Sequence, residues 1–350
     1  MTQSVSGESN SIEKPLNLSL KERATITRQL SALVDAGLPI AKGIRVITTQ
    51  ASKPKLKREL TQILSDLEEG ISLSQSFRRW DNFMLSLLKA GEKSGELSEI
   101  LNRLALFYEE RFRLQNQVIT TLTYPLVILA VSILVFIGMI VVILPQFSQV
   151  YARLGGELPQ YTQFWMMISA FLRSPCGIGL ALILAIFTYG LIQNIERYAL
   201  SLQRALLPVP ILGELVIQFS ATRFARTLGM LLRSGVPLTQ SLDIASTPLF
   251  PMDVLKLQVS EGVKLHEAME KYTRLFPEML VTMVAVGEET GELNKLLLKA
   301  ADYYDQELAG LLSRLTSLIE PGIIIILGGL IGSVVISMYL PMFQLFNQIQ

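Results

Sequence analysis

The sequence predicts an all-α polytopic membrane protein with two homologous cytosolic helical-bundle domains, of about six helices each, and three transmembrane helices. Three observations lead to this fold class. Half of the 350 residues are hydrophobic, and many of them fall in long uncharged runs. The two large polar segments between these runs resemble each other along their length. In both segments, apolar residues recur at the three- and four-residue steps of a helix.

Three apolar runs are candidates for membrane spans, since a helix of about 20 apolar residues crosses the hydrocarbon core. The first, Leu126–Leu144, and the third, Gly322–Leu340, carry no charged residue and are preceded by Pro125 and Pro321. The second, about Gly177–Ile192, is shorter and richer in glycine and alanine. The sequence therefore predicts three crossings.

The distribution of basic residues predicts how the spans are oriented. Lys and Arg number 17 before the first span, two between the first and second, 12 between the second and third, and none after the third. Because basic segments stay in the cytosol, both large polar segments are expected inside. The N-terminus is then cytosolic and the C-terminus external.

The expected order of segments follows from these spans. Residues 1–18 are polar, lack the apolar core of a secretory signal and are expected to form a flexible leader. The other segments are a first cytosolic domain (19–123), a first transmembrane helix (124–145), an external loop (146–175), a second transmembrane helix (176–195), a second cytosolic domain with its linker (196–320), a third transmembrane helix (321–343) and a short external tail (344–350).

An internal repeat organises the chain. The segment LVDAGLPI, Leu33–Ile40, matches LLRSGVPL, Leu231–Leu238, at an offset of 198 residues. The segment GEKSGEL, Gly91–Leu97, matches GEETGEL, Gly287–Leu293, at an offset of 196. The similarity continues through the proline that leads each outer span, so the first and third spans belong to the repeat and the second does not. Both copies should therefore enter the membrane in the same direction.

Each copy is expected to form six helices that are separated by glycine and proline turns. In the first copy the helices are predicted near 20–36, 40–50, 54–69, 72–78, 81–91 and 96–122. Two Gly-x-Pro pairs, Gly37 with Pro39 and Gly235 with Pro237, fit a glycine that ends one helix and a proline that opens the next.

The paired GExxGEL loops could be structural turns or binding sites. Glycines stand where two helices would reverse direction; they are Gly91, Gly95, Gly287 and Gly291. Acidic residues near the start of the next helix match its positive dipole. The same carboxylates could instead supply oxygen ligands to a divalent cation; the candidates are Glu92, Glu96, Glu99, Glu288, Glu289 and Glu292. The dipole explanation needs no ion, so no metal or other cofactor is predicted.

The last helix of each copy is expected to continue into the membrane. In the second copy an apolar stripe leads up to Pro321, which should kink the helix without ending it. Cytosolic domain and span would then act as one lever. In the third span, Gly328 and Gly332 are spaced to let another helix approach closely, either from the same chain or from a second copy.

Several kinds of chemistry lack the residues that they need. The sequence has no GxxxxGK[ST] phosphate loop, one histidine, His266, and one cysteine, Cys176. Nucleotide hydrolysis and a structural zinc site are therefore not expected, and His266 is expected on the surface. No charged residue or histidine falls within the predicted spans, which disfavours an ion-coupled transporter. The 31 basic and 30 acidic residues nearly balance, so direct nucleic-acid binding is not expected.

Two charge patterns indicate possible partner surfaces. A basic stretch around Pro54 could meet an acidic partner or could be a solvated helix start; it comprises Lys53, Lys55, Lys57 and Arg58. Residues 1–123 carry a net charge of +3 and residues 193–320 a net charge of −3. This difference would permit head-to-tail contact between protomers, or two distinct partner surfaces.

The combined motifs resemble a known family. The paired L-[VL]-x-[AS]-G-[LV]-P-[IL] and G-E-x-[ST]-G-E-L motifs, the proline-led outer spans and the extra second span closely resemble the type II secretion F and type IV pilus platform family, over about residues 20–346. The resemblance implies a non-enzymatic, multi-pass subunit of the bacterial inner membrane. Its implied partners are a hexameric motor ATPase, (pseudo)pilins, other inner-membrane assembly proteins, membrane lipid and a second copy in a dimer.

The function that the resemblance implies is to couple the motor ATPase to the insertion or extraction of (pseudo)pilins, in a system for secretion, DNA uptake or motility. Two other classes stay open: a membrane scaffold or receptor without a motor, and a small-solute transporter. Three spans per chain without a charged residue or histidine fit an ion-coupled transporter poorly. Co-purification of a motor ATPase and pilins would distinguish the platform subunit from a scaffold or receptor without a motor.

Overall fold

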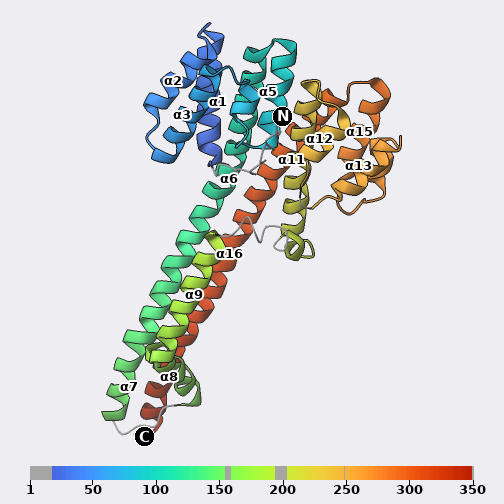
Figure 1. The fold of residues 1–350 in the computed structure, drawn as a ribbon. Helices are drawn as coiled ribbons and strands as arrows, with labels where there is room; N and C mark the ends of the chain where they lie inside the picture. The colour runs from blue at the N-terminus through green and yellow to red at the C-terminus, as the bar shows by residue number, and fades with distance from the viewer. Residues whose placement is uncertain (1–17, 154–158, 194–202, 248, 349–350) are drawn as a thin grey trace, which may run out of the picture. The chain divides into compact units, whose positions relative to one another are not determined.

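The structure is a computed structural model that describes residues 18–153, 159–193, 203–247 and 249–348. The predicted leader lies almost entirely outside these residues. All regular elements in the described ranges are helices, which confirms the predicted all-α class (Figure 1). The chain divides into two compact units. Unit 1 comprises residues 1–116 and 214–308, and unit 2 comprises residues 117–213 and 309–350.

Unit 1 contains the helical domain of both copies. The helices of the first copy are α1 (Leu20–Asp35), α2 (Ile40–Gln50), α3 (Pro54–Glu68), α4 (Leu73–Ser76), α5 (Asn82–Ser94) and the start of α6 (Leu97–Gly138). Those of the second copy are α11 (Leu212–Arg233), α12 (Leu238–Ile244), α13 (Met252–Ser260), α14 (Leu265–Glu270), α15 (Glu278–Thr290) and the start of α16 (Leu293–Gln348). Six helices per copy are thus present, as predicted.

Local side-chain contacts explain where the helices of the first copy begin. Ser19 and Glu22 form a reciprocal capping box at α1, in which the Glu22 carboxylate accepts from the Ser19 backbone N–H at 2.9 Å. Pro54 occupies the first turn of α3, where its missing N–H is not needed. Asp81 caps α5 by accepting from the Met84 N–H at 2.9 Å.

The Gly-x-Pro turns have the geometry expected from the sequence. Gly37 and Gly235 adopt positive φ angles of 83° and 78°, which cost glycine little. The next residue donates back to the helix in both copies, from Leu38 to the Leu33 carbonyl and from Val236 to the Leu231 carbonyl, each at 3.0 Å. This is the Schellman arrangement. Pro39 and Pro237 then stand at the N-cap positions of α2 and α12.

The core of unit 1 is built from the apolar faces of its helices. Leu30, Leu60 and Leu87 are fully buried in the first copy, and Leu231 and Val236 from the second copy join the same cluster. The Arg103 guanidinium also donates to the Arg233 carbonyl at 2.9 Å and to Ser234 Oγ at 3.1 Å. The two copies therefore pack against each other. In the second copy, Phe224, Phe250 and Phe276 form an aromatic cluster.

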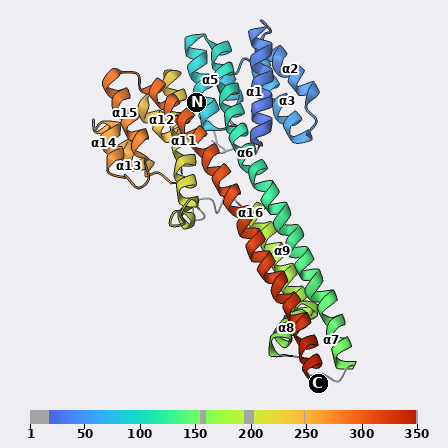
Figure 2. The same cartoon turned by 180° about the vertical axis from the view of Figure 1, so that it is seen from behind.

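Unit 2 contains the apolar parts of two long helices. It comprises residues 117–138 of α6, the π-helical turn η1 (Met139–Ile143), α7 (Leu144–Arg153), α8 (Gln160–Arg173), α9 (Pro175–Gln193) and residues 309–348 of α16. In this unit α6, α9 and α16 run side by side (Figures 1 and 2). Both long helices continue through their prolines, Pro125 and Pro321, as predicted for the repeat.

Two helices of the described chain are long and apolar enough to cross a membrane. They contain the predicted first and third spans, and only 6% and 17% of their most apolar windows are buried within the protein. Such helices need an apolar surrounding to cover them. The predicted second span corresponds to α9, and its crossing stays a prediction. Two helices, α7 and α8, occupy much of the segment predicted as the external loop.

Side chains of α8 donate to backbone carbonyls of the π-helical turn η1 and of α16. Ser169 Oγ on α8 donates to the Ile140 carbonyl at 2.8 Å, and the Arg173 guanidinium donates to the Val141 carbonyl. Thr162 Oγ1 similarly donates to the Ser337 carbonyl of α16 at 2.6 Å. Because unpaired backbone groups are costly in an apolar surrounding, α8 secures both long helices at this level.

The glycine pair of the third span makes no close packing contact within the described chain. A Cβ atom at Gly328 or Gly332 would meet no atom within 4 Å there. The prediction that these glycines allow close helix approach therefore finds no intramolecular partner among the described residues, and a contact with a second copy stays a prediction.

Candidate functional site: the paired GExxGEL segments and the charged surfaces beside them

The first glycine of each GExxGEL segment lies inside a helix. The prediction ended the fifth helix at residue 91, but α5 continues to Ser94 and α15 to Thr290. Gly91 and Gly287 are buried because the next helix passes directly over them. A Cβ at Gly91 would lie 2.9 Å from Ile100 Cγ1, and one at Gly287 would lie 2.8 Å from the backbone Cα of Leu293. The first glycine is thus a packing position.

The second glycine of each segment makes the turn. Gly95 and Gly291 have φ angles of 76° and 73° and end α5 and α15 in the left-handed conformation. Glu96 and Glu292 follow, at the start of α6 and α16, where their carboxylates are exposed. A hydrogen bond from Lys295, together with its charge, lowers the pKa of Glu292. These positions match the predicted placement of acidic residues at a positive helix end.

The first glutamate of the first copy has a role that the sequence did not reveal. Glu92 reaches back along the chain and accepts from the Ser74 backbone N–H at 3.1 Å and from Ser74 Oγ at 2.6 Å. Ser74 lies in α4, a helix of a single turn. Glu92 therefore ties α5 to the otherwise unsatisfied N-terminal donors of α4.

The second copy repeats this contact with a different partner. Glu288 accepts from the backbone N–H groups of Leu265 and His266 at 2.7 and 3.1 Å, and it contacts His266 Nδ1 at 2.5 Å. His266, which was expected on the surface, is partly buried, with 15% of its side chain exposed. The imidazole packs against the capping carboxylate, which the spacing of the sequence could not indicate.

The carboxylates of these segments point to different partners. In the described ranges, no group of three or more His, Cys, Asp or Glu side chains is arranged to hold a metal ion. Glu92 and Glu288 accept hydrogen bonds from α4 and α14, whereas Glu96 and Glu292 lie at the exposed starts of the next helices. Helix ends account for these four glutamates, and Glu99 pairs with Arg103 on α6.

We expect Glu92→Ala to lower the free energy of unfolding by about 1–3 kcal/mol, because a buried N–H and a hydroxyl lose their charged acceptor. Glu92→Gln should lose less stability, since its amide oxygen can still accept a hydrogen bond from Ser74. Glu96→Ala is the matched control and should change stability by less than about 0.5 kcal/mol. Thermal unfolding of the full chain in detergent, followed by circular dichroism, measures all three. Equal midpoints for Glu92→Ala and Glu96→Ala would contradict this role.

A second repeated contact joins the first and last helices of each copy. Arg28 on α1 pairs with Glu109 on α6, with both side chains about 40% exposed. The hydrogen bond from Arg28 lowers the pKa of Glu109. At the equivalent place in the second copy, Arg226 on α11 pairs with Asp305 on α16, but these side chains are only 9% and 8% exposed. Burial raises the pKa of Asp305 although Arg226 opposes it.

The predicted basic stretch contributes to a wider surface. Lys53 pairs with Glu22 at 2.9 Å, whereas Lys55 and Arg58 line an open groove of about 740 Å³ that also includes Arg78 and Arg79. We call this the basic groove and define it by Lys55, Arg58, Arg78 and Arg79. The adjacent arginines Arg78 and Arg79 lie at the junction between two predicted helices, a sequence signal that the basic stretch around Pro54 does not include.

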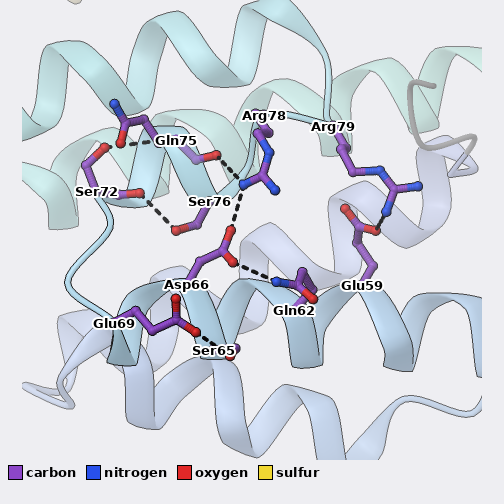
Figure 3. A network of polar contacts seen from close by, with 10 residues as sticks. All are labelled: Glu59, Gln62, Ser65, Asp66, Glu69, Ser72, Gln75, Ser76, Arg78 and Arg79. Carbon is purple, nitrogen blue, oxygen red and sulfur yellow. Dashed lines mark hydrogen bonds and ion pairs between the residues drawn. The ribbon is translucent and has the colours of Figure 1, made fainter. Parts of the chain in front are cut away.

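Buried carboxylates position the two arginines of the basic groove. Arg78 pairs with Asp66 at 2.7 Å and Arg79 pairs with Glu59 at 2.6 Å (Figure 3). Gln62 Nε2 also donates to Asp66 at 2.8 Å. The side chains of Glu59 and Asp66 are only 4% and 5% exposed. These contacts fix the edge of the groove to α3.

The second copy lacks basic counterparts of Lys55 and Arg58 in the basic groove. When Gly70 and Gly262 are aligned, Thr247 and Phe250 take the places of Lys55 and Arg58. Both are 5% exposed, whereas Lys55 and Arg58 are exposed. Duplication has therefore kept the fold of the two copies but not this charged surface.

Comparison with known proteins defines the class to which the chain belongs. A family model described as type II secretion system (T2SS), protein F, matches residues 26–145 and 224–341. The starts of the two matched segments are 198 residues apart and their ends 196, in agreement with the repeat, and each match includes an outer apolar span. The chain belongs to the type II secretion system protein F family.

Relatives from two kinds of machine match over nearly the whole chain. The type IV pilus assembly protein PilC of Pseudomonas aeruginosa is 33% identical over 349 residues, which cover 95% of this chain and 91% of the relative. PilC of Thermus thermophilus is 33% identical, with 94% and 83% coverage. The type II secretion system protein F of Vibrio cholerae is 29% identical, with 94% and 84% coverage. The chain is thus a platform-type membrane protein of the class shared by pilus assembly and type II secretion.

Proposed function

We propose that this chain is a non-enzymatic inner-membrane platform subunit that couples a cytosolic hexameric motor ATPase to the insertion or extraction of (pseudo)pilins. The observation that carries the proposal is the duplicated arrangement of a six-helix domain whose last helix continues without interruption into an apolar segment. Two such elements can respond to a soluble motor while contacting subunits within the bilayer. The names of the relatives support a role in these machines.

The proposed orientation has the N-terminus and both helical domains in the cytosol and the C-terminus outside. The basic residues that precede the outer spans support it. A platform of this kind acts by holding and moving other proteins, so the energy comes from the ATPase and no catalytic group is required on this chain. Direct binding to nucleic acid is not part of the proposed role.

The basic groove is the proposed contact with the motor. It is exposed, it carries four basic side chains against the single buried acid Glu59 on its wall, and Lys55 and Arg58 have no basic counterparts in the second copy. Arg78 and Arg79 are held in place by Asp66 and Glu59. A groove with this charge fits an acidic face of a partner, and such contacts weaken as the salt concentration rises.

We expect the double variant Lys55→Glu with Arg58→Glu to reduce recovery of the motor ATPase with the full-length protein at least tenfold, and to reduce filament assembly or secretion in parallel, because four units of charge are reversed at the contact. Lys89→Glu is the matched control, since Lys89 is an exposed residue on α5 of the same domain. Affinity purification from membranes, followed by quantification of the ATPase, gives the measurement.

Two results would argue against this proposal at different levels. If wild-type protein recovers neither ATPase nor pilins, or if deletion of either helical domain leaves assembly intact, the coupling function is wrong. If the wild type recovers the ATPase and the double variant does so equally well, the function stands and the basic groove is not the contact.

A further inference from the structure

A cavity in unit 1 lies where the two copies meet, and neither the family nor the proposed function explains it. It encloses about 200 Å³ between α6 and α11. We call it the junction cavity. Its wall carries three arginines, Arg111, Arg223 and Arg226, beside the polar groups of Gln115 and Thr222 and apolar residues that include Phe107. The wall contains no acidic side chain.

Two of the three arginines have no hydrogen-bonded anion within the described chain. Arg111 packs over the Phe107 ring, with its guanidinium carbon 5.5 Å from the ring centroid, and Arg223 is near enough to Arg111 for the two charges to repel. The third, Arg226, is 8% exposed, and its Nε has no acceptor in the part of the chain that is described. Guanidinium donors therefore converge on the cavity without an oxyanion to receive them.

The nearest carboxylates are already engaged elsewhere. Asp81 accepts from Tyr108 at 2.7 Å, from the Met84 N–H at 2.9 Å and from Arg23. Asp302 and Asp305 both pair with Arg226, and neither lines the cavity. In the described part of the chain, none of these three carboxylates forms an ion pair with Arg111 or Arg223. The cavity thus keeps an excess of positive charge.

The pKa values of Arg111 and Arg223 reflect their burial and, for Arg223, the repulsion from Arg111. Burial lowers the pKa of Arg111. Burial and the charge of Arg111 together lower the pKa of Arg223 to about 10. The second-copy counterpart of Arg111 is Glu307, and the first-copy counterpart of Arg223 is Thr25, so duplication alone did not produce the pair.

We propose that the junction cavity binds a phosphate group, with Arg111 and Arg223 as the main donors and Arg226 Nε, Gln115 and Thr222 as additional ones. Planar guanidinium groups suit phosphate because they can donate two parallel hydrogen bonds. The phosphate can belong to a soluble phosphorylated molecule or to a lipid headgroup. A ligand that bridges α6 and α11 links the two copies, so its occupancy regulates how firmly they are joined.

Binding of inorganic pyrophosphate to full-length protein in a neutral detergent tests the proposal. Isothermal titration at constant ionic strength is expected to show saturable binding to one site. Arg111→Lys and Arg223→Gln should each weaken it at least tenfold, because each removes charge-assisted hydrogen bonds. Arg274→Gln, which removes an exposed arginine outside both the cavity and the basic groove, should leave the affinity unchanged. Absence of saturable binding, or equal affinity in all variants, overturns the proposal.

A stability measurement separates a binding role from a structural one. Without pyrophosphate, Arg223→Gln should have an unfolding temperature equal to or above that of the wild type, because a repulsion is removed. Pyrophosphate should then raise the midpoint of the wild type and not that of the variant. A variant that is less stable than the wild type without ligand would identify Arg223 as a structural residue and would overturn its assignment as a donor.

The source of the phosphate is distinguished in nanodiscs. Pyrophosphate affinity is compared in discs of phosphatidylcholine alone and in discs with one third phosphatidylglycerol, at equal ionic strength. If phosphatidylglycerol weakens pyrophosphate binding to the wild type, the site takes the phosphate of a lipid headgroup. Unchanged affinity identifies a soluble phosphorylated molecule. Both results retain the phosphate site, and neither depends on the ATPase contact.

Discussion

Arg226→Ala is expected to lower the free energy of unfolding by about 3–5 kcal/mol, because it removes the main partner of the buried Asp305 carboxylate and leaves only Arg113, at 4.0 Å. Only 8% of the Asp305 side chain is exposed, and burial already raises its pKa in the intact pair. The measurement is chemical or thermal unfolding of the full chain in detergent. Replacing both residues by leucine should recover much of the loss, since no buried charge then remains.

The loss in Arg226→Ala should also depend on pH. In the variant, the pKa of Asp305 in the folded protein is raised further above its unfolded value. Below the unfolded value the carboxyl is neutral in both states and costs nothing. The penalty grows as the pH rises through the folded pKa and is complete above it. The difference between wild type and variant should therefore shrink on acidification from neutral pH.

The first copy supplies the control for this prediction. Arg28→Ala removes the equivalent arginine, but Arg28 and Glu109 are each about 40% exposed, so water solvates the remaining carboxylate. The Arg28→Ala variant should therefore lose at most about 1 kcal/mol of unfolding free energy. If Arg28→Ala and Arg226→Ala lowered the unfolding free energy by similar amounts, burial would not explain how much the second pair contributes to stability.

Gly287→Ala is expected to destabilise the second copy by about 1–3 kcal/mol, even though alanine favours helices over glycine. The added Cβ would lie 2.8 Å from the Leu293 Cα, and a backbone atom cannot move aside without displacing α16. The loss should lower the amount of folded protein in the membrane and, with it, filament assembly or secretion. Immunoblotting of membranes and thermal unfolding give the two readouts.

Two glycines serve as comparisons for Gly287. At Gly91 the nearest atoms belong to the side chains of Ile100 and Leu97, which can shift, so Gly91→Ala should cost less. At Gly310, in α16, a Cβ would meet nothing within 4 Å among the described residues. Gly310→Ala should raise stability by up to about 1 kcal/mol through helix propensity. If Gly287→Ala were as stable as Gly310→Ala, close approach to Leu293 would not constrain this position.

Much of the fold could be predicted because the relevant signals are local. The first-copy helices begin within about one residue of their predicted positions, since Ser19, Pro54 and Asp81 mark the starts of α1, α3 and α5. The Gly-x-Pro turns were predicted from two residue types. The repeat offset predicted that both outer spans follow a helical domain, and both family matches include such a span.

The contacts that define the candidate sites could not be predicted in the same way. Glu92 and Glu288 were assigned to the start of the following helix, whereas they cap a helix that precedes them by about 20 residues. His266 was expected on the surface because a single histidine has no pattern around it. The junction cavity combines residues about 110 positions apart, and no periodicity or motif brings such residues together.

The sequence separation of two contacts in the first copy sets the earliest point at which each can form during synthesis. Glu92 is only 18 residues from Ser74, so this cap can form soon after α5 leaves the ribosome. Arg28, by contrast, must wait for Glu109, which is 81 residues later and shortly precedes the first apolar run. The contact between α1 and α6 can therefore form only after the segment that leads into the first apolar run has been made. We expect delays in membrane insertion and defects in domain folding to accompany each other in this chain.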